Sequence, residues 1–359
     1  MKILSFESSC DETAVAVLEA EGDKITVLSS TVATQIDIHR LYGGVVPEIA
    51  SRAHIDAISA LCYEALTESG CTLGDIDLVA VTANPGLIGA LLVAVNFAKS
   101  LAVANGIPLV PVDHIKGHIA AAYLNTEEPP KPPFLALALS GGHTSIYRVD
   151  TYTDYRTIGE TRDDAIGESF DKIGRMIGIP YPAGRGFDAL SLEGFIEATG
   201  KEEGAYEAYK KAKLYREGDF VLPSPALNDG TLDFSFSGLK TAAINLLHRY
   251  EQKGMELNRA LFAARYTYEV AEAVAKKIAL AIDENPDLGA LVVAGGVAAN
   301  SHLRAVLAKV AKKKGIPLYI PALSLCGDNA AMIGAQGYYE YINGKTADST
   351  LNASAMDSI

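Results

Sequence analysis

The sequence predicts an α/β protein with two lobes, built on one duplicated pattern, and a cleft between them. Residues 2–20 form an apolar run, a small polar turn and a second apolar run, which indicates strand, turn and strand. Residues 133–150 repeat this arrangement, although they share few letters with the first copy. Residues 126–133 carry four prolines, which is typical of a linker. A chain of 359 residues is long enough for two such units.

The first lobe is expected over residues 1–125. After the opening strands, residues 76–106 indicate a buried strand, a glycine turn and a helix that ends at Gly106. Residues 108–124 then predict a short strand that runs into a helix carrying His114 and His118.

The second lobe is expected over residues 134–325. A charged, tyrosine-rich stretch near residues 190–232 predicts a helical insertion, and residues 288–315 indicate a strand, a glycine turn and a helix. Residues 326–345 are expected to form a terminal helix that packs back toward the first lobe. The remaining residues, 346–359, are expected to be a poorly structured tail.

Composition places the chain among ordinary globular proteins, with 49% hydrophobic and 21% charged residues. Acidic residues appear near the start before any apolar run long enough for a signal peptide. The most apolar stretch, residues 86–106, is interrupted by Asn96 and Lys99, so we do not expect it to span a bilayer. The four cysteines lack a C-x-x-C spacing, which indicates reduced thiols. We therefore expect a cytoplasmic protein that makes no contact with a membrane.

The formal net charge of −13 argues against a chain that binds nucleic acid over a broad basic face. Positive charge is local and gathers in two runs. Either run is explained by a solvated helix face, so an RNA substrate would imply a small footprint or a helper subunit. The two runs contain Lys210, Lys211, Lys213 and Arg216, and Lys309, Lys312, Lys313 and Lys314.

The pair His114 and His118 has the spacing of a metal site. Residues four apart on a helix lie on the same face, so two imidazoles can bind one divalent ion. Ile115, Lys116 and Gly117 fill the gap, so the general base of the H-E-x-x-H proteases is missing.

A third metal ligand has to come from elsewhere in the chain. Asp328 stands at the start of the last predicted helix, where an aspartate serves equally well as an N-cap. His143 is a further candidate, although a glycine turn suits substrate contact better. Two histidines and one carboxylate would leave coordination positions open, as in catalytic metal sites.

Three turns have the character of anion-binding loops: residues 7–13, 139–144 and 294–300. Each follows a predicted buried strand and offers small residues whose backbone N–H groups can approach a phosphate. The Gly-Gly pairs at 141–142 and 295–296 lack the Cβ atoms that would hold an anion away. The three turns together favour a phosphate-bearing ligand in the interlobe cleft, and the P-loop pattern is missing.

Polar residues of the second lobe add candidates for contact with that ligand. Asp171 and Asp188 suit ribose hydroxyl groups, although helix capping and surface charge explain such carboxylates equally well. Lys240 is a candidate to neutralise a phosphate, with simple exposure as the alternative.

Eight segments in order along nearly the whole chain resemble the TsaD family of tRNA threonylcarbamoyltransferases. They are FESSCDETAVAV, YGGVVPEIASRAH, HIKGHIAAAY, LSGGHTSIY, GESFDKIGRMIG, DFSFSGLKTA, AGGVAANSHLR and GDNAAMIG. The resemblance implies an actin/Hsp70/sugar-kinase-like (ASKHA) fold with an interlobe nucleotide cleft. It also implies transfer of threonylcarbamoyl from threonylcarbamoyl-AMP to N6 of adenosine 37, with release of AMP, in tRNAs that read codons beginning with A.

The resemblance also assigns residues and partners. It implies that His114, His118 and Asp328 bind one divalent metal per subunit, Fe²⁺ or alternatively Zn²⁺. It implies tRNA as substrate and TsaB and TsaE as partner subunits. Asp11 and Glu12 are candidates to accept the proton from the N6 amine. The implied substrate-binding residues are Leu139, Ser140, Gly141, Gly142, His143, Asp171, Gly184, Asp188 and Asn300.

Three other functions remain open from the sequence. A small-molecule kinase or carbamoyltransferase of the same fold would phosphorylate or carbamoylate a metabolite. A metalloprotease would need a base beside the metal, which H-I-K-G-H does not supply. A non-catalytic partner such as TsaB would lack the metal triad, which this chain keeps.

Overall fold

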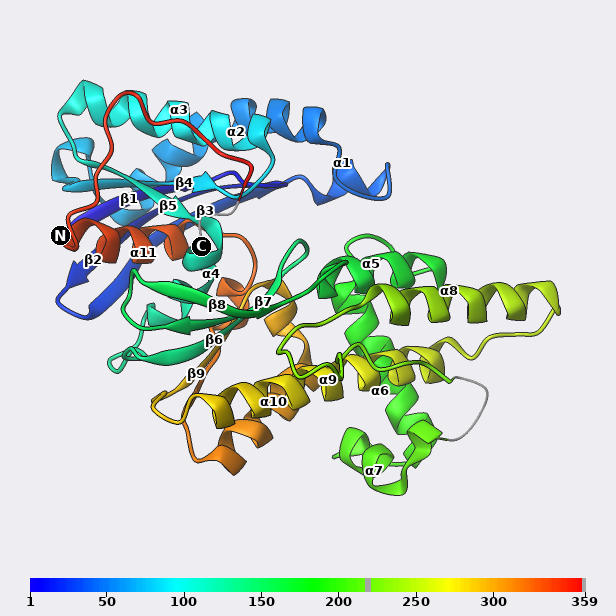
Figure 1. Ribbon diagram of the computed structural model, residues 1–359. Helices are drawn as coiled ribbons and strands as arrows, with labels where there is room; N and C mark the ends of the chain where they lie inside the picture. The colour runs from blue at the N-terminus through cyan, green and yellow to red at the C-terminus, as the bar shows by residue number, and fades with distance from the viewer. Residues whose placement is uncertain (217–220, 357–359) are drawn as a thin grey trace.

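Two five-stranded mixed sheets with the same topology form the centres of two lobes (Figure 1). The computed structural model describes residues 1–216 and 221–356. In the first sheet the order is β3-β2-β1-β4-β5: β1–β2 and β2–β3 pair antiparallel, and β1–β4 and β4–β5 pair parallel. Its strands are β1 (Lys2–Glu7), β2 (Glu12–Glu21), β3 (Lys24–Thr34), β4 (Leu78–Asn84) and β5 (Leu109–Asp113).

The second sheet repeats every pairing of the first. Its order is β8-β7-β6-β9-β10, in which β6 takes the place of β1 and pairs antiparallel with β7 and parallel with β9. The duplicated α/β fold predicted from two strand–turn–strand units is confirmed. The strands are β6 (Phe134–Leu139), β7 (Thr144–Val149), β8 (Tyr155–Glu160), β9 (Leu291–Ala294) and β10 (Leu318–Tyr319).

Helices α2 (Pro47–Ser69) and α3 (Ile88–Asn105) cover the outer face of the first sheet, and α1 (Ile36–Arg40) precedes them. Proline at the first position suits the start of α2, and α3 ends at Gly106 in the left-handed conformation, as predicted. Among the described helices α3 alone is long and apolar enough, by length and composition, to cross a membrane, with a mean hydropathy of 1.6. Its buried side chains pack on the sheet. Core helices of globular proteins can have the same length and apolar composition as a membrane-spanning helix.

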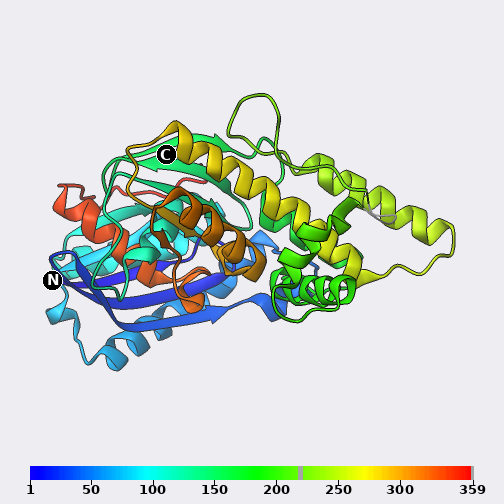
Figure 2. The ribbon, with the colours of Figure 1, turned by 90° about the horizontal axis from the view of Figure 1, so that it is seen from below.

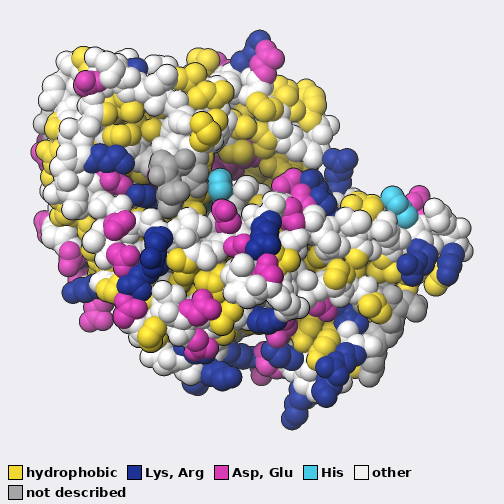
Figure 3. Space-filling view, in the orientation of Figure 1, with side chains coloured by type: hydrophobic (Ala, Val, Ile, Leu, Met, Phe, Trp, Pro, Cys, Tyr) yellow, Lys and Arg dark blue, Asp and Glu magenta, His cyan; other side chains and the backbone are white. Residues whose placement is uncertain are grey.

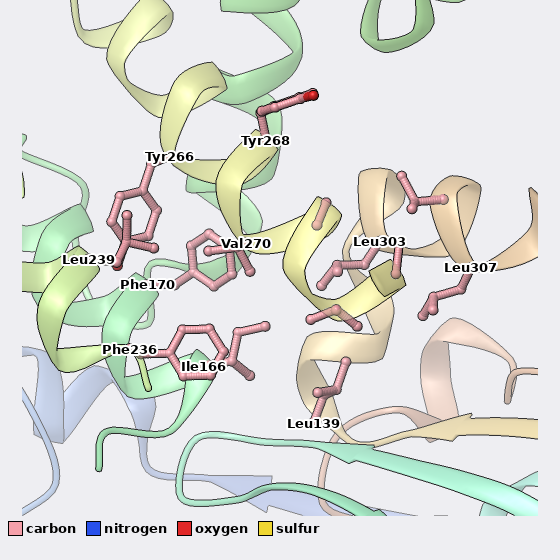
Figure 4. Packing of buried hydrophobic residues seen from close by; sticks show 14 of the residues in the cluster. Leu139, Ile166, Phe170, Phe236, Leu239, Tyr266, Tyr268, Val270, Leu303 and Leu307 are labelled. Carbon is pink, nitrogen blue, oxygen red and sulfur yellow. The ribbon is translucent and has the colours of Figure 1, made fainter. Parts of the chain in front are cut away.

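The second lobe carries a larger helical layer, in which α5 to α9 lie between β8 and β9 in the chain and α10 lies between β9 and β10. Helices α6 and α7 cover the first part of the predicted insertion 190–232, whereas residues 221–232 form no helix and residues 217–220 lie outside the described part of the chain. Helices α9 and α10 lie side by side in both views (Figures 1 and 2). Figure 4 shows their core, where Phe170 of α5, Leu239 of α8 and Tyr266 of α9 pack together. The helices are α5 (Ile166–Met176), α6 (Gly184–Thr199), α7 (Ala205–Ala212), α8 (Ser237–Gln252), α9 (Arg259–Glu284) and α10 (Ser301–Lys314).

Helices α4 (His114–Ala120) and α11 (Ala330–Ile342) lie between the two sheets. One buried cluster joins their side chains to the inner faces of both sheets, so these helices form the interlobe core. Gly117 allows the close approach of α4 to α11, because a Cβ there would lie 2.6 Å from Cδ1 of Ile333. The glycine between the two histidines is therefore a packing requirement. Short 3₁₀ turns occur at Leu73–Asp75, Ala121–Tyr123, Leu214–Arg216, Gly296–Ala299 and Leu323–Leu325.

The segment after α11 is ordered, which corrects the expectation of a poorly structured tail for its described part, residues 346–356. The Ala347 amide donates to the Leu109 carbonyl, and the Ser354 amide donates to the Ala83 carbonyl at 2.9 Å. Leu351 packs against the first-lobe core. The sequence suggested disorder because short polar residues dominate this segment, but backbone hydrogen bonds and a few apolar contacts hold it. The last three residues lie outside the described part of the chain.

Candidate metal centre and interlobe cleft

The structure brings His114, His118 and Asp328 together, with one ligand atom of each within 4.8 Å of the others. Oδ1 of Asp328 lies 3.2 Å from Nε2 of His118 and 3.6 Å from Nε2 of His114. Both histidines are buried and Asp328 is partly buried. Neither ring nitrogen of His118 has a hydrogen bond of acceptable geometry among the described residues. Because a buried polar atom without a partner is costly, this donor set fits a cation.

Glu7 orients His114, a role that was not predicted from the sequence. Its Oε2 lies 3.0 Å from Nδ1 of His114 and accepts from Thr82 Oγ1 at 2.6 Å. A carboxylate can only accept, so Nδ1 carries the proton and Nε2 faces the cluster. The position of Glu7 in the register gave the only signal, since the last residue of β1 and the start of α4 meet at one edge of a sheet.

Asn329, not Asp328, caps α11. The Asn329 Oδ1 accepts from the Met332 amide at 2.9 Å, which leaves the side chain of Asp328 free to turn toward the histidines. The capping alternative for Asp328 is therefore wrong, because its neighbour takes that position. Asp113 caps α4 in the same way through the Ile115 and Lys116 amides.

The charges in the cluster shift the pKa of each member. Burial lowers the pKa of His114, but the carboxylates of Glu7 and Asp328 outweigh burial and raise it to about 9 in the absence of a metal. Burial raises the pKa of Asp328, but the imidazoles of His114, His118 and His143 hold it below its usual range. His143 thus lies near enough to act on the cluster from the second lobe.

The first turn places Asp11 and Glu12 beside this cluster. Burial, followed by the charges of Asp328 and Asp11, raises the pKa of Glu12 to about 9. Oη of Tyr181, from the second lobe, donates to Asp11 Oδ2 at 3.4 Å. The Arg40 guanidinium in turn donates to the Tyr181 carbonyl, so these contacts join the lobes across the cleft.

The second and third turns pack on each other and leave their outer glycines open. Gly295 adopts φ +92°, and a Cβ there would lie 2.3 Å from the Leu139 carbonyl oxygen, so this glycine serves turn packing. Gly141, Gly142 and Gly296 are exposed, and a Cβ at any of them would meet no atom within 4 Å. The sequence grouped these four glycines together, but only three of them face open space. Leu139 is fully buried, so only its backbone is near the cleft.

The remaining predicted substrate residues bind backbone groups in this structure. Asp171 Oδ1 accepts from the Ala183 amide at 2.7 Å, just before Gly184 begins α6. Asp188 accepts from the Ser301 amide and hydroxyl. Asn300 caps α10 through the His302 and Leu303 amides. These residues hold the turns, and Gly184 lies exposed with open space around it.

Ser140 and Lys240 have more local partners. The Ser140 hydroxyl accepts from the His143 amide at 3.0 Å and shapes the second turn. Lys240 forms an ion pair with Asp164, and its side chain is only 18% exposed. The alternative of simple exposure for Lys240 is therefore wrong. In the space-filling view, acidic side chains gather at the hollow between the lobes (Figure 3).

Two solved structures share this architecture. The structure of T. kodakarensis HypF aligns with a TM-score of 0.53 and 14% identity over 96% of this chain and 48% of that chain. Full-length HypF in its phosphate- and nucleotide-bound form aligns with a TM-score of 0.52 and 14% identity over 97% of this chain and 47% of that chain. At this identity the likeness shows the fold alone. The chain is a two-lobed α/β protein of the ASKHA class, as predicted.

Sequence relatives identify the family within this class. The family model described as TsaD, tRNA N6-adenosine threonylcarbamoyltransferase, matches residues 26–335. Relatives with that name are 47% identical in Clostridium botulinum (strain 657 / Type Ba4) and 45% identical in Clostridium novyi (strain NT), each over 98% of this chain and 96% of the relative. A relative in Staphylococcus saprophyticus is 45% identical over 98% of this chain and 94% of its own length. The chain belongs to the TsaD family.

Family membership confirms the predicted enzyme class. The chain is a tRNA-modifying transferase that acts on N6 of adenosine in t6A biosynthesis. The names of the relatives support group transfer over the kinase and protease alternatives. The buried His114–His118–Asp328 cluster is a site that could hold a metal in such an enzyme.

Proposed function

We propose that this chain transfers threonylcarbamoyl from threonylcarbamoyl-AMP to N6 of adenosine 37, in tRNAs that read codons beginning with A. The N6–carbonyl bond forms, the bond between that carbonyl and the AMP phosphate oxygen breaks, and N6 loses a proton as AMP leaves. The donor is already activated, so the protein has to position two substrates and stabilise charge. The observation that carries the proposal is a buried His-His-Asp cluster beside exposed glycine turns in a TsaD chain.

His114, His118 and Asp328 are proposed to hold one divalent metal per subunit, with Fe²⁺ expected and Zn²⁺ as the alternative. The buried imidazole of His118, which faces Asp328 without a well-aligned hydrogen bond among the described residues, and the orientation of His114 by Glu7 support this fit. Such an ion would act as a Lewis acid toward an oxygen of the donor.

The glycine turns and the carboxylates of the second lobe are proposed to hold the donor. Backbone amides at Gly141, Gly142 and Gly296 are open to an anion, as the adenylate phosphate requires. Leu139, Ser140 and His143 shape or flank the second turn. Within the described residues the second carboxylate oxygen of Asp171 accepts no hydrogen bond, and Gly184 stands beside it, which suits a ribose hydroxyl. Asp188 and Asn300 hold the start of α10 and keep the third turn in place.

Asp11 is proposed as the proton acceptor for N6, and Glu12 is not. Burial and the charges of Asp328 and Asp11 raise the pKa of Glu12, which favours its protonated form and makes it the weaker proton acceptor of the two. Asp11 reaches the same part of the cleft and is bound by Tyr181 from the opposite lobe. Replacing Asp11 with Asn should lower the rate constant by about 10²–10⁴-fold with little change in donor binding, whereas Glu12→Gln should cost less.

A reconstituted reaction tests the proposal. Purified metal-loaded protein, unmodified tRNA and threonylcarbamoyl-AMP are combined with and without TsaB and TsaE, and modified adenosine is measured by mass spectrometry. We expect product that depends on the donor. If no combination yields product, the proposed reaction is refuted.

TsaB and TsaE are proposed as partner subunits, and the cytoplasm, where tRNA is found, as the place of action. The first lobe exposes large apolar side chains over α1 and α2, including Leu41 at 83% and Tyr63 at 75% (Figure 3). Such a surface suits a protein partner. Co-elution of the three proteins should be lost in a Leu41→Glu/Tyr63→Glu variant, and retained binding to TsaB would contradict this surface.

A further inference from the structure

The two basic runs of the sequence meet on one surface of the second lobe. Lys309 of α10 forms an ion pair with Glu207 of α7, although about a hundred residues separate them. A surface hollow of about 270 Å³ lies between α7, α9 and α10 and is lined by Lys210, Lys309, Lys313 and Lys314. Dark blue side chains gather over α7 in the lower part of Figure 3. We name as the α7–α10 basic surface the four lysines that line this hollow together with the exposed basic residues next to them in the chain, Lys211, Lys213, Arg216 and Lys312.

Local acidic residues neutralise only part of this charge. Lys210, Lys309 and Lys314 pair with Glu272, Glu207 and Asp283. Lys211, Lys213, Lys312 and Lys313 are exposed and form no ion pair within residues 1–216 and 221–356. In a chain of net charge −13, this concentration of cations indicates an acidic partner.

The position of the surface relative to the cleft suits a long substrate. Helix α10 begins at the third glycine turn, where Asn300 caps it, and its 14 residues extend about 21 Å toward the basic end. RNA helices advance about 3 Å per base pair, so phosphates some seven base pairs beyond adenosine 37 lie at a comparable distance from N6. These phosphates belong to the helical part of the tRNA, outside the anticodon loop.

We propose that the α7–α10 basic surface binds the phosphate backbone of the tRNA helix beyond the anticodon loop. This inference rests on tRNA as the substrate of the family. The surface sets the position of the tRNA without reading its sequence, because contacts to phosphates carry no sequence information. It also reconciles an acidic chain with a polyanionic substrate, since the footprint is small and local.

Charge reversal on full-length and shortened RNA tests the proposal. Lys312→Glu/Lys313→Glu is compared with wild type in the metal-loaded protein with TsaB and TsaE. The substrates are full-length unmodified tRNA and an anticodon-loop hairpin with a short stem. For full-length tRNA we expect Kd to rise about tenfold, and the slope of log Kd against log salt to fall by about two. For the hairpin we expect Kd and kcat within about twofold of wild type, because the hairpin lacks the distant phosphates.

A matched control separates a local contact from net charge. Lys131→Glu/Lys253→Glu makes the same change of charge at exposed lysines outside the surface and should leave Kd for full-length tRNA within about twofold. Equal weakening in this control, or equal weakening for tRNA and hairpin, would overturn the proposal.

A second variant covers the case in which α10 is damaged. If Lys312→Glu/Lys313→Glu loses activity on the hairpin, the variant Lys211→Glu/Lys213→Glu, on the other basic run, replaces it in the test. Unchanged affinity of this second variant for full-length tRNA would overturn the proposal. If the wild-type protein modifies neither RNA, the proposed transfer reaction is refuted. The Kd values for tRNA then still test whether the α7–α10 basic surface binds tRNA.

Discussion

The first turn, Glu7–Thr13, and the second turn, Leu139–Thr144, occupy equivalent places in the two sheets but differ in what they present. The first lies between β1 and β2 and buries its polar side chains, with Glu7 1% exposed and Asp11 7% exposed. The second lies between β6 and β7 and exposes the bare backbone of Gly141 and Gly142. At equivalent positions of the duplicated fold, one turn buries charged side chains, and the other exposes bare backbone that we propose binds an anion.

This difference separates two tasks that are hard to combine. A metal site needs ligands held by hydrogen bonds and shielded from water, as Glu7 holds His114. An anion-binding turn needs unfilled space beside its backbone, and a Cβ at Gly142 would meet no atom within 4 Å. The following variants change either the His114–His118–Asp328 cluster beside the first turn or the second turn, and should leave the other unaffected.

Removal of both histidines should have the largest effect. His114→Ala/His118→Ala should lose metal content and lower transfer by about 10³-fold or more, because the donor oxygen loses its charge stabilisation. Metal analysis and the transfer assay measure both quantities. His248→Ala, an exposed histidine outside the cluster, serves as the control. A fully active double variant would refute the metal site.

Glu7→Gln should weaken metal binding by about 10–100-fold while leaving the second turn unaffected. It should also change the pH dependence. The imidazole must be deprotonated to bind a metal, so with a pKa near 9 wild-type affinity should rise about tenfold per pH unit from 7 to 9. Without the Glu7 charge, the pKa of His114 falls and this rise should end at lower pH. Metal titrations at several pH values measure the shift, with exposed Glu64→Gln as control, and an unchanged profile would contradict the role of Glu7.

Gly117→Ala should push α4 away from α11. The added methyl group meets Ile333, and overpacking of this kind costs about 1–3 kcal/mol of unfolding free energy. Metal affinity should fall about tenfold, because His114 and His118 move relative to Asp328. Gly238→Ala in α8 meets no atom within 4 Å and should leave stability unchanged or raised. Thermal unfolding and metal titration compare the two, and equal stability would argue against the close packing.

Gly142→Ala should have the smallest effect and should act on the second turn alone. Its methyl group enters open space, so folding and metal content stay as in wild type while KM for the donor rises about tenfold. Steady-state kinetics measure this change, and Gly44→Ala, which also enters open space, is the control. A lower kcat with unchanged KM would contradict a binding role.

Much of the fold was predictable because the duplicated strand pattern survives in the sequence. The apolar runs at β1, β2, β6 and β7 have a period and length typical of strands, and Gly106 ended α3 where expected. The order of the segment up to Ser354 was not predicted. Backbone hydrogen bonds to Leu109 and Ala83 hold this segment, and such bonds do not depend on which side chains the segment carries.

The metal site was partly predictable for a similar reason. The spacing of His114 and His118 is local and visible, whereas the contact of Glu7 joins residues 107 apart in sequence. Whether Asp328 or Asn329 caps α11 depends on the exact residue at which the helix begins, and sequence patterns do not locate a helix end to within one residue. Family resemblance supplied Asp328, and the geometry is consistent with it.

The order of the chain through the lobes also has a consequence for synthesis on the ribosome. Helix α11 covers the inner face of the first sheet, yet it is translated after the entire second lobe. The amino-terminal half therefore emerges with His114 and His118 available but without Asp328 and without its covering helix. The proposed metal site is therefore complete only after residue 328 has been translated, and a nascent chain that stalls earlier lacks its third proposed ligand.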